Sequence, residues 1–315
     1  MLITLIRRLV ILAASLVVAS VVVFWLLSGL ADPARIALGT GATDDSVVAL
    51  RAQMGLNRPL VTQYLDWAGG AVHGDFGISF VSRAAIGPQL FDRLSVTLWL
   101  VAGAMLLSIV LAVPFGLLSA LGQRRWYGAP VTVLTQLGVA VPAFLFGILL
   151  VALFAVKLGW FPSGGYVVPA ADPGGFVQHM ILPWLALGIV QAAVLTRYVR
   201  SAVLDQLGQD YLRTARAKGL TPGQALIRHG LRNAAIPVLT VLGVQLVTVL
   251  IGAVVVEQVF AIPGIGSWLV DAVGNQDTLT VQAIVITVVA IALAVSFLVD
   301  LLYLLIDPRL RRVRT

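Results

Sequence analysis

The chain has 315 residues, of which 59% are hydrophobic and only 11% are charged. Because soluble domains contain roughly a quarter charged residues, this composition indicates a polytopic membrane protein and not a soluble protein with a large core. The net charge of +7 does not indicate nucleic-acid binding, since cations in a membrane protein follow the orientation of its spans. The chain contains no cysteine, which excludes disulfides and thiol chemistry.

The first predicted element is an uncharged run from Leu9 to Leu30, preceded by Arg7 and Arg8. At about 1.5 Å per residue the run extends for roughly 33 Å, which is enough to cross a bilayer. No Ala-x-Ala-like cleavage site closes it, so we expect a retained span and not a cleaved signal peptide. Residues 1–30 are therefore predicted to form a cytoplasmic end and the first span.

A polar segment, residues 31–93, comes next and carries nearly balanced charges. A turn-like run at 55–59 precedes a helical pattern that starts at Leu60. Tyr64 and Trp67 in that helix suit the membrane interface, where amphipathic rings are enriched. We expect an ordered segment on the outer surface. His73 has no second ligand nearby and indicates a surface residue, not a metal site.

Five further uncharged stretches predict five more spans, at 94–123, 126–156, 180–196, 233–256 and 278–299. The predicted fold is thus an all-α integral membrane protein with six transmembrane helices, whose five-span core runs from 94 to 308. With the N-terminus inside, fifteen of the twenty-one Lys and Arg residues lie on the inner side. The positive-inside rule then places both termini in the cytoplasm, including a basic tail at 309–315.

Residues 205–232 are predicted to form a helical hairpin in a cytoplasmic loop, called the basic hairpin from here on. Three cations fall within six positions, at Arg213, Arg216 and Lys218. Gly219 suits the left-handed position after a helix, and Thr221-Pro222-Gly223-Gln224 reads as a capping box that starts a second helix. An ordered basic hairpin indicates a docking surface for a partner. The alternative is that its charge simply marks a cytoplasmic loop.

The sequence shows no chemistry that would make the chain an enzyme. It contains no Gly-x-x-x-x-Gly-Lys-Ser/Thr run, no Gly-x-Ser-x-Gly elbow and no His-Glu-x-x-His helix. The predicted topology places His73 and His179 outside and His229 inside, so these histidines do not share one metal. We therefore expect no catalytic residue, no metal site and no cofactor on this chain.

Polar residues within the spans are candidates for a substrate path. Gln191, Gln245 and Thr248 indicate either hydrogen bonding between helices or the lining of a pathway. Glu257, at the end of the fifth predicted span, is either an interfacial carboxylate or part of a gate. Both interpretations stay open for each residue.

A basic hairpin on a chain without a nucleotide site fits an energised transporter whose motor is another subunit. A secondary transporter, a channel or an assembly factor is also compatible with these features. A secondary transporter that couples to ions predicts ionisable residues in the middle of the spans, and these are missing here. An intramembrane enzyme predicts a nucleophile and base or a metal cluster, which are also missing.

Six separated stretches resemble, in order and spacing, the permease subunits of ATP-binding-cassette importers for dipeptides, oligopeptides and nickel. The resemblance covers nearly the whole chain. The stretches are Gly-Leu-Asn-Arg-Pro-Leu at 55–60, Gly-Asp-Phe-Gly-Ile-Ser at 74–79, Thr-Ala-Arg-Ala-Lys-Gly-Leu at 214–220, His-Gly-Leu-Arg-Asn-Ala-Ala-Ile-Pro at 229–237, Val-Glu-Gln-Val-Phe-Ala-Ile-Pro-Gly-Ile-Gly at 256–266 and Asp-Leu-Leu-Tyr-Leu-Leu-Ile-Asp-Pro-Arg at 300–309.

This resemblance implies the fold of a type I importer permease in the bacterial inner membrane. It also implies a second homologous permease subunit, two ATP-binding subunits that hold ATP and magnesium, and an extracytoplasmic substrate-binding protein, besides contact with membrane lipid and none with nucleic acid. The implied cargo is a dipeptide or oligopeptide, with nickel, glutathione or another small solute as the alternative.

The basic hairpin resembles the coupling loop of these permeases, which docks on the ATPase subunit. The residues that would carry this coupling are Tyr211, Arg213, Thr214, Ala215, Arg216, Ala217, Lys218 and Gly219. The general importer signature begins Glu-Ala-Ala, whereas this chain has Arg213, Thr214 and Ala215; the glutamate is absent and the later Gly219 is retained. The peptide branch shares this form, so any contact made by the general glutamate does not transfer to this chain.

Overall fold

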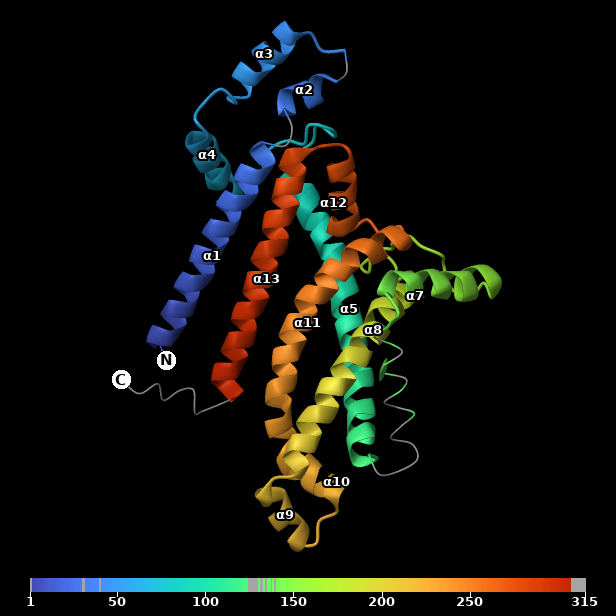
Figure 1. The fold of residues 1–315 in the computed structure, drawn as a ribbon. Helices are drawn as coiled ribbons and strands as arrows, with labels where there is room; N and C mark the ends of the chain where they lie inside the picture. Colours follow the sequence, from blue (N-terminus) through green and yellow to red (C-terminus); the bar gives the residue numbers. More distant parts are fainter. Residues whose placement is uncertain are drawn as a thin grey trace. The chain divides into compact units, whose positions relative to one another are not determined.

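The computed structural model describes residues 2–29, 32–39, 41–123, 130, 133, 135, 136, 138 and 140–306, with side chains from 5 to 302. The chain divides into two compact units (Figure 1). Unit 1 comprises Met1–Thr97 and Pro263–Phe297, and unit 2 comprises Leu98–Ile262 and Leu298–Thr315. Within the described residues the elements are helices, and the one β-bridge joins Ile78 to Ala85.

Five helical segments are long and apolar enough to cross a membrane, by length and composition. They contain the helices α1 (Leu2–Ser28), α5 (Ile86–Leu121), α8 (Pro173–Leu207), α11 (Leu231–Val259) and α13 (Thr278–Ile306). These helices match five of the six predicted spans. The all-α membrane fold predicted from the sequence is therefore confirmed.

The predicted span at 126–156 lies partly outside the described residues. Its described end contains α7 (Ala143–Leu150), which continues as a π-helical segment, η1 (Val151–Lys157). Together these form an apolar helix that is shorter than the five long ones. Figure 1 shows α7 lying across the direction of α8 and not along it. Arg124, Arg125 and the basic tail at 309–315 also lie outside the described residues.

Unit 1 contains α1, the residues 32–93 that are described after it, α12 (Ile265–Gly274) and most of α13. Short helices occupy the predicted outer segment: α2 (Pro33–Leu38), α3 (Asp44–Gln53) and α4 (Leu60–Val72). Side-chain caps start two of them, because the Asp32 carboxylate accepts from Ala34 N and the Thr43 hydroxyl accepts from Ser46 N, whereas α4 follows Pro59 without such a cap. The buried core of this unit is formed by Phe76, Ile86, Leu90, Ile265, Ala283, Ile284 and Ile286.

The charges of the outer segment are largely paired with one another, which explains their near balance. Three ion pairs join side chains of this segment: Arg35 with Asp44 at 2.9 Å, Arg51 with Asp32 at 2.8 Å, and Arg58 with Asp66 at 2.7 Å. The segment also rests on the first span, because Tyr64 and Trp67 pack against Phe24 and the Tyr64 hydroxyl hydrogen-bonds Ser20 Oγ at 2.8 Å. This part of the chain is thus ordered, as the sequence predicts.

Asp277 connects the loop before α5 to the start of α13 through hydrogen bonds. Its carboxylate, only 3% exposed, accepts from Ser79 Oγ at 2.5 Å and from Thr280 Oγ1 at 2.7 Å. Ser79 Oγ in turn accepts from the backbone N–H groups of Val81 and Ser82. A buried carboxylate is tolerated when its acceptor capacity is satisfied in this way.

Unit 2 is built on α5, α8 and α11, which approach closely at glycine. A Cβ at Gly188 of α8 would come within 3.0 Å of the Ala104 carbonyl oxygen of α5, and Gly116 of α5 faces the side chain of Val199. Small residues allow this close packing of membrane helices. Trp184 closes the other end of the α5–α8 contact, since its indole Nε1 donates to the Trp99 carbonyl at 3.1 Å.

Candidate functional site

The basic hairpin begins with α9 (Asp210–Ala217), whose end is set by glycine. Gly219 has a φ of +94°, and its N–H donates to the Arg216 carbonyl at 3.0 Å. The Leu220 N–H donates to the Ala215 carbonyl at 3.4 Å. These two bonds form a Schellman motif, which needs a left-handed residue at the position of Gly219. The helix end predicted from the sequence is confirmed.

The second half of the hairpin starts with α10 (Pro222–Ala225) and the predicted capping box is present. The Gln224 N–H donates to Thr221 Oγ1 at 3.3 Å, while the Thr221 N–H donates to Gln224 Oε1 at 3.0 Å. The predicted second helix therefore starts here, but it does not end before the fifth predicted span. α10 passes through the π-helical η2 (Leu226–Gly230) directly into α11, so Pro222–Val259 is one continuous helical segment.

The inner face of the basic hairpin is fastened to the long helices of unit 2. Leu212 and Ala215 of α9 and Leu226 of η2 are buried in one apolar cluster with Leu195 and Val199 of α8. Burying a leucine side chain contributes about 1.5–3 kcal/mol. The hairpin is therefore held to the helix ends by apolar packing as well as by the chain itself.

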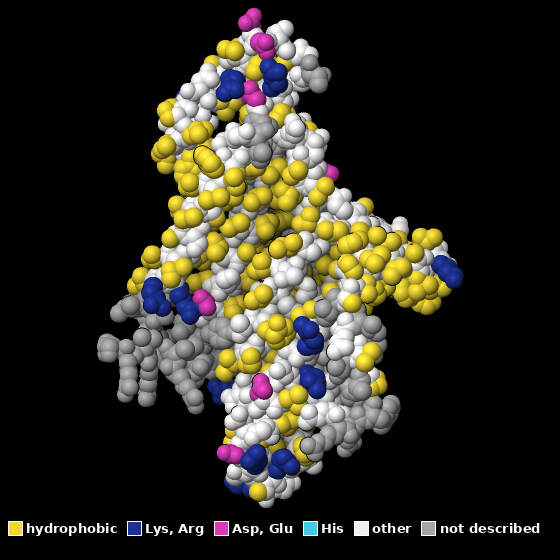
Figure 2. Space-filling view, in the orientation of Figure 1, with side chains coloured by type: hydrophobic (Ala, Val, Ile, Leu, Met, Phe, Trp, Pro, Cys, Tyr) yellow, Lys and Arg dark blue, Asp and Glu magenta, His cyan; other side chains and the backbone are white. Residues whose placement is uncertain are grey.

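The outer face of the hairpin is polar and accessible. Most of the predicted coupling residues are exposed: Tyr211, Arg213, Thr214, Arg216, Ala217, Lys218 and Gly219. Figure 2 shows Lys and Arg side chains gathered around this end of unit 2. Arg213 pairs with Asp210 at 3.4 Å, but the two side chains are 69% and 94% exposed, and such surface pairs contribute little. The cations therefore remain available to an acidic partner.

Tyr211 joins the hairpin to both long helices that flank it. Its hydroxyl donates to Gln206 Oε1 of α8 at 2.6 Å and accepts from Asn233 Nδ2 of α11 at 3.3 Å. Tyr211 is among the coupling residues that the family resemblance indicates, whereas Gln206 and Asn233 are not. Asn233 lies in the resembling stretch at 229–237, but nothing in that stretch shows that its side chain meets Tyr211, 22 residues earlier.

The structure brings together two of the predicted pathway residues. Gln191 of α8 and Gln245 of α11 are buried, and Gln245 Nε2 donates to the Gln191 carbonyl oxygen at 3.2 Å. The Oε1 atom of Gln245 is buried without a hydrogen-bond partner among the described residues. Thr248 lies on an exposed face and donates to the Val244 carbonyl of its own helix, so it does not join the glutamine pair.

Glu257 is fully buried near the end of α11, with 0% exposure. It is therefore not the exposed carboxylate that an interfacial position would give. The chain turns sharply just after it: the Ile262 N–H donates to the Glu257 carbonyl at 2.8 Å, and Ala261 adopts a φ of +49°. Gly165, in the loop before α8, donates to the Phe260 carbonyl at 2.8 Å and packs this loop onto the turn.

The titration and metal chemistry of the described residues are limited. Burial raises the pKa of the Tyr166 phenol, in the loop before α8, because desolvation penalises the phenolate. Tyr166 packs edge-on against Phe176 at a centroid distance of 6.0 Å. Within the described ranges no group of three or more His, Cys, Asp or Glu residues is placed to hold a metal ion.

The chain also matches the sequence models of a known family of membrane proteins. Residues 112–312 match the family described as binding-protein-dependent transport system inner membrane component, and residues 1–101 match the model of the N-terminal part of such membrane components. The chain belongs to this family, and it is an inner-membrane permease component of an ATP-binding-cassette importer.

Particular relatives are similar over almost their whole length. The chain is 39% identical to the glutathione transport system permease protein GsiC of Escherichia coli K12 over 307 residues, which cover 97% of this chain and 98% of the relative. The same identity and coverage hold for GsiC of Shigella dysenteriae serotype 1. GsiC of Shigella flexneri serotype 5b is 38% identical.

Two solved structures share the fold. The MetNI methionine ABC transporter in inward-facing conformations aligns with a TM-score of 0.55 at 18% identity, over 69% of this chain and 96% of that chain. An amino acid ABC transporter crystallised with histidines aligns with a TM-score of 0.51 at 18% identity, over 68% of this chain and 92% of that chain. The fold is that of a type I importer permease.

Proposed function

We propose that this permease forms half of the translocation pathway of an importer for small peptide-type solutes and couples it to ATP hydrolysis on partner subunits. The basic hairpin is the observation that carries this proposal. It has an exposed cationic face, an apolar face fastened to the long helices, and a helical connection into α11 without a break.

The coupling argument follows from that geometry. A partner that pulls on α9 acts on a rigid element, because both ends of the hairpin turn are capped and Tyr211 ties α9 to α8 and α11. A displacement therefore passes into α11 instead of being absorbed by a loose loop. Rigid-body shifts of packed helices are a standard route for such two-state switching. ATP and magnesium would be held by the partner subunits.

The pathway is proposed to run beside the buried glutamine pair. Gln245 Oε1 is a buried acceptor without a partner in the described part of the chain, so a hydrogen-bond donor on a passing solute or a water molecule would satisfy it. Gln191 positions that carboxamide through its carbonyl. Thr248 and Glu257 are proposed as further pathway or gate residues, because they lie on the same helix as Gln245.

The cargo is proposed to be a short peptide-type compound, with glutathione as the first candidate. The relatives named above are described as glutathione permeases, which favours the glutathione alternative over dipeptides and oligopeptides in general. Glutathione is itself a tripeptide, so both candidates share carboxylate and amide groups. Nickel is the chemically distinct alternative.

The proposed assembly contains a second homologous permease, two ATP-binding subunits and an extracytoplasmic substrate-binding protein. The relatives support a multi-pass position in the inner membrane. We place both termini and the basic hairpin in the cytoplasm, because fifteen of twenty-one cations then lie on the inner side.

Uptake into proteoliposomes tests the proposal. The proteoliposomes carry the complex with its binding protein outside and with ATP supplied to the ATPase subunits. We expect them to accumulate labelled glutathione or a labelled dipeptide but not ⁶³Ni²⁺. Accumulation must stop when ATP is replaced by a non-hydrolysable analogue. Accumulation that continues without the ATPase subunits would show a self-sufficient secondary transporter, and uptake of nickel alone would assign the other cargo.

A further inference from the structure

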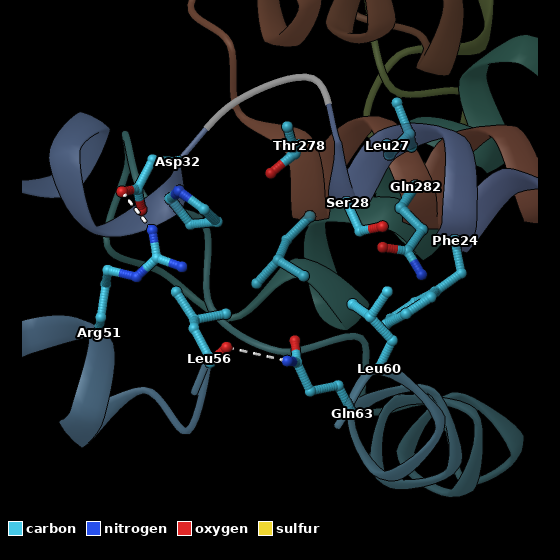
Figure 3. A pocket seen from close by; sticks show the side chains of 12 residues that line it. Phe24, Leu27, Ser28, Asp32, Arg51, Leu56, Leu60, Gln63, Thr278 and Gln282 are labelled. Carbon is cyan, nitrogen blue, oxygen red and sulfur yellow. Dashed lines mark hydrogen bonds and ion pairs between the residues drawn. The ribbon is translucent and has the colours of Figure 1, made fainter. Parts of the chain in front are cut away.

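Unit 1 contains a cavity that the coupling function does not use. Its volume is about 340 Å³, and all of its lining residues belong to unit 1. Figure 3 shows side chains converging on it from the end of α1, from α3 and α4, and from the start of α13. Pockets for small molecules occupy about 300–1,000 Å³, so this cavity has the size of a site for a compact ligand.

Gln282 of α13 supplies an unsatisfied polar group at this cavity. Its side chain is only 4% exposed, and its Nε2 atom is buried without a hydrogen-bond partner among the described residues. A buried donor without a partner destabilises the folded state, so its presence in a cavity wall points to a ligand that accepts from it. Replacement by leucine should therefore cost the fold little or nothing.

Arg51 provides a second donor on the opposite side of the cavity. One of its terminal nitrogens donates to Asp32 Oδ2 at 2.8 Å, and Figure 3 shows the other directed toward the middle of the lining residues. The Asp32 carboxylate is already engaged on both oxygens, because Oδ1 accepts from Ala34 N at 3.1 Å. The side chain of Asp32 is 27% exposed, and its ion pair with Arg51 offsets part of its negative charge.

The start of α13 also borders the cavity, because Thr278, the first residue of this 29-residue helix, lines it. The Asp277 carboxylate already caps this helix: its Oδ1 accepts from the Thr280 N–H at 3.4 Å, and its Oδ2 accepts from the hydroxyls of Ser79 and Thr280. The donors left for an acceptor in this cavity are therefore those of Arg51 and Gln282.

The other lining residues indicate which further chemical groups a ligand of this cavity would carry. Gln63 uses its Nε2 to donate to the backbone oxygens of Leu56 and Arg58, and Figure 3 shows its Oε1 facing the cavity as an acceptor. Phe24 and Leu60 supply apolar wall. The cavity thus matches a ligand that combines a carboxylate, an N–H group and an aliphatic side chain.

We propose that this cavity binds the carboxyl-terminal end of a free peptide-type solute, with the carboxylate between Arg51 and Gln282 and an amide N–H on Gln63. The choice of a peptide as the solute rests on the proposed function, whereas the need for an acceptor rests on the cavity alone. A loop of the binding protein could present similar groups, but the cavity volume of about 340 Å³ and the donors on opposite walls favour a small molecule.

The test uses the full-length chain in its permease–ATPase complex, in nanodiscs, without ATP and without binding protein. Tritiated L-alanyl-L-leucine is the probe, measured by scintillation proximity. We expect saturable binding that is displaced by the unlabelled dipeptide and at least tenfold less well by its carboxyl-terminal amide. Gln282→Leu and Arg51→Met should each weaken binding about tenfold or more, with a melting temperature close to that of the unchanged complex.

Matched controls are present in the same unit. Gln89 is a half-buried glutamine of α5 that does not line the cavity, and its Nε2 donates to the Ala85 carbonyl, while Arg35 forms the exposed pair with Asp44. Gln89→Leu and Arg35→Met should leave binding unchanged. Equal binding in all four variants, no saturable binding, or binding that appears only after the binding protein is added would overturn the proposal.

ATP-driven uptake, measured in parallel, separates this inference from the proposed function. Uptake by a complex that shows no binding without the binding protein would leave the importer function standing and remove the cavity site. The opposite result is a complex that takes up no peptide but binds the dipeptide only when Gln282 is present. That result would support the cavity site and count against a peptide as the transported cargo.

Discussion

Gly219 provides the sharpest test of the coupling mechanism. Its φ is +94°, and a Cβ built there would have no atom within 4 Å. Gly219→Ala therefore adds no steric clash with neighbours, and its whole cost is the left-handed backbone, about 1–2 kcal/mol. An energy of that size changes the population of the closed Schellman turn by roughly five- to thirtyfold.

Gly223, four residues later, is the matched control. A Cβ there also has no atom within 4 Å, but the residue lies in α10 with an ordinary helical φ. Alanine in such a position stabilises by about 0.4–1 kcal/mol, because it restricts the unfolded chain. The two substitutions are chemically identical, and only the backbone conformation of the glycine differs.

The assay is ATP hydrolysis by the reconstituted complex, with and without loaded binding protein. Gly219→Ala should reduce the stimulated rate severalfold while the complex still assembles and inserts, since the loosened turn absorbs part of the movement. Gly223→Ala should match or exceed the unchanged complex. Equal stimulated rates for both variants, or equal losses in both, would refute the argument that a rigid helix end transmits the coupling.

Three further substitutions test other parts of the structure. Asp277→Ala removes the buried acceptor of Ser79 and Thr280 and should destabilise the complex by about 1–3 kcal/mol, seen as a lower melting temperature; an unchanged melting temperature would contradict the buried network. Ala261→Gly relaxes a residue at a φ of +49° and should raise thermal stability by up to about 1 kcal/mol, whereas a decrease would show that the Ala261 methyl group contributes packing. Tyr211→Phe removes the hydroxyl that bridges α8 and α11, at a cost of about 1 kcal/mol per hydrogen bond. It should lower stimulated ATP hydrolysis, while the KM for uptake of the proposed peptide-type cargo stays unchanged. A changed KM with a normal stimulated rate would assign Tyr211 to the substrate path instead.

Features that depend only on residues close together in the sequence were predictable from the sequence. A membrane-length apolar run needs no distant partner to form a helix, because a chain in lipid must satisfy its own hydrogen bonds. Five of the six predicted spans follow from that rule. The Schellman end at Gly219 and the capping box at Thr221 are equally local, since each bond joins residues three to five positions apart.

The continuation of α10 into α11 could not be predicted from local sequence. The capping box at Thr221 marks a helix start, and no local pattern indicates where that helix ends. In the structure a π-helical turn accommodates this stretch, because Leu226 and Ala225 are buried against the long helices and hold it helical. Packing thus overrides the local propensity for a break.

By itself, the sequence determined that this is a membrane protein with an ordered basic hairpin, since charge, apolar length and capping residues act over short distances. Its six stretches indicated a permease through their resemblance to a known family. Only the tertiary structure decided which polar groups meet. Ser79 and Asp277 are 198 residues apart, yet they share a buried hydrogen bond. Gln282 Nε2 has no hydrogen-bond partner within the described part of the chain and lies beside a cavity that five helices line. Such contacts depend on how the helices pack, and packing depends on the summed shape of all side chains instead of any short pattern.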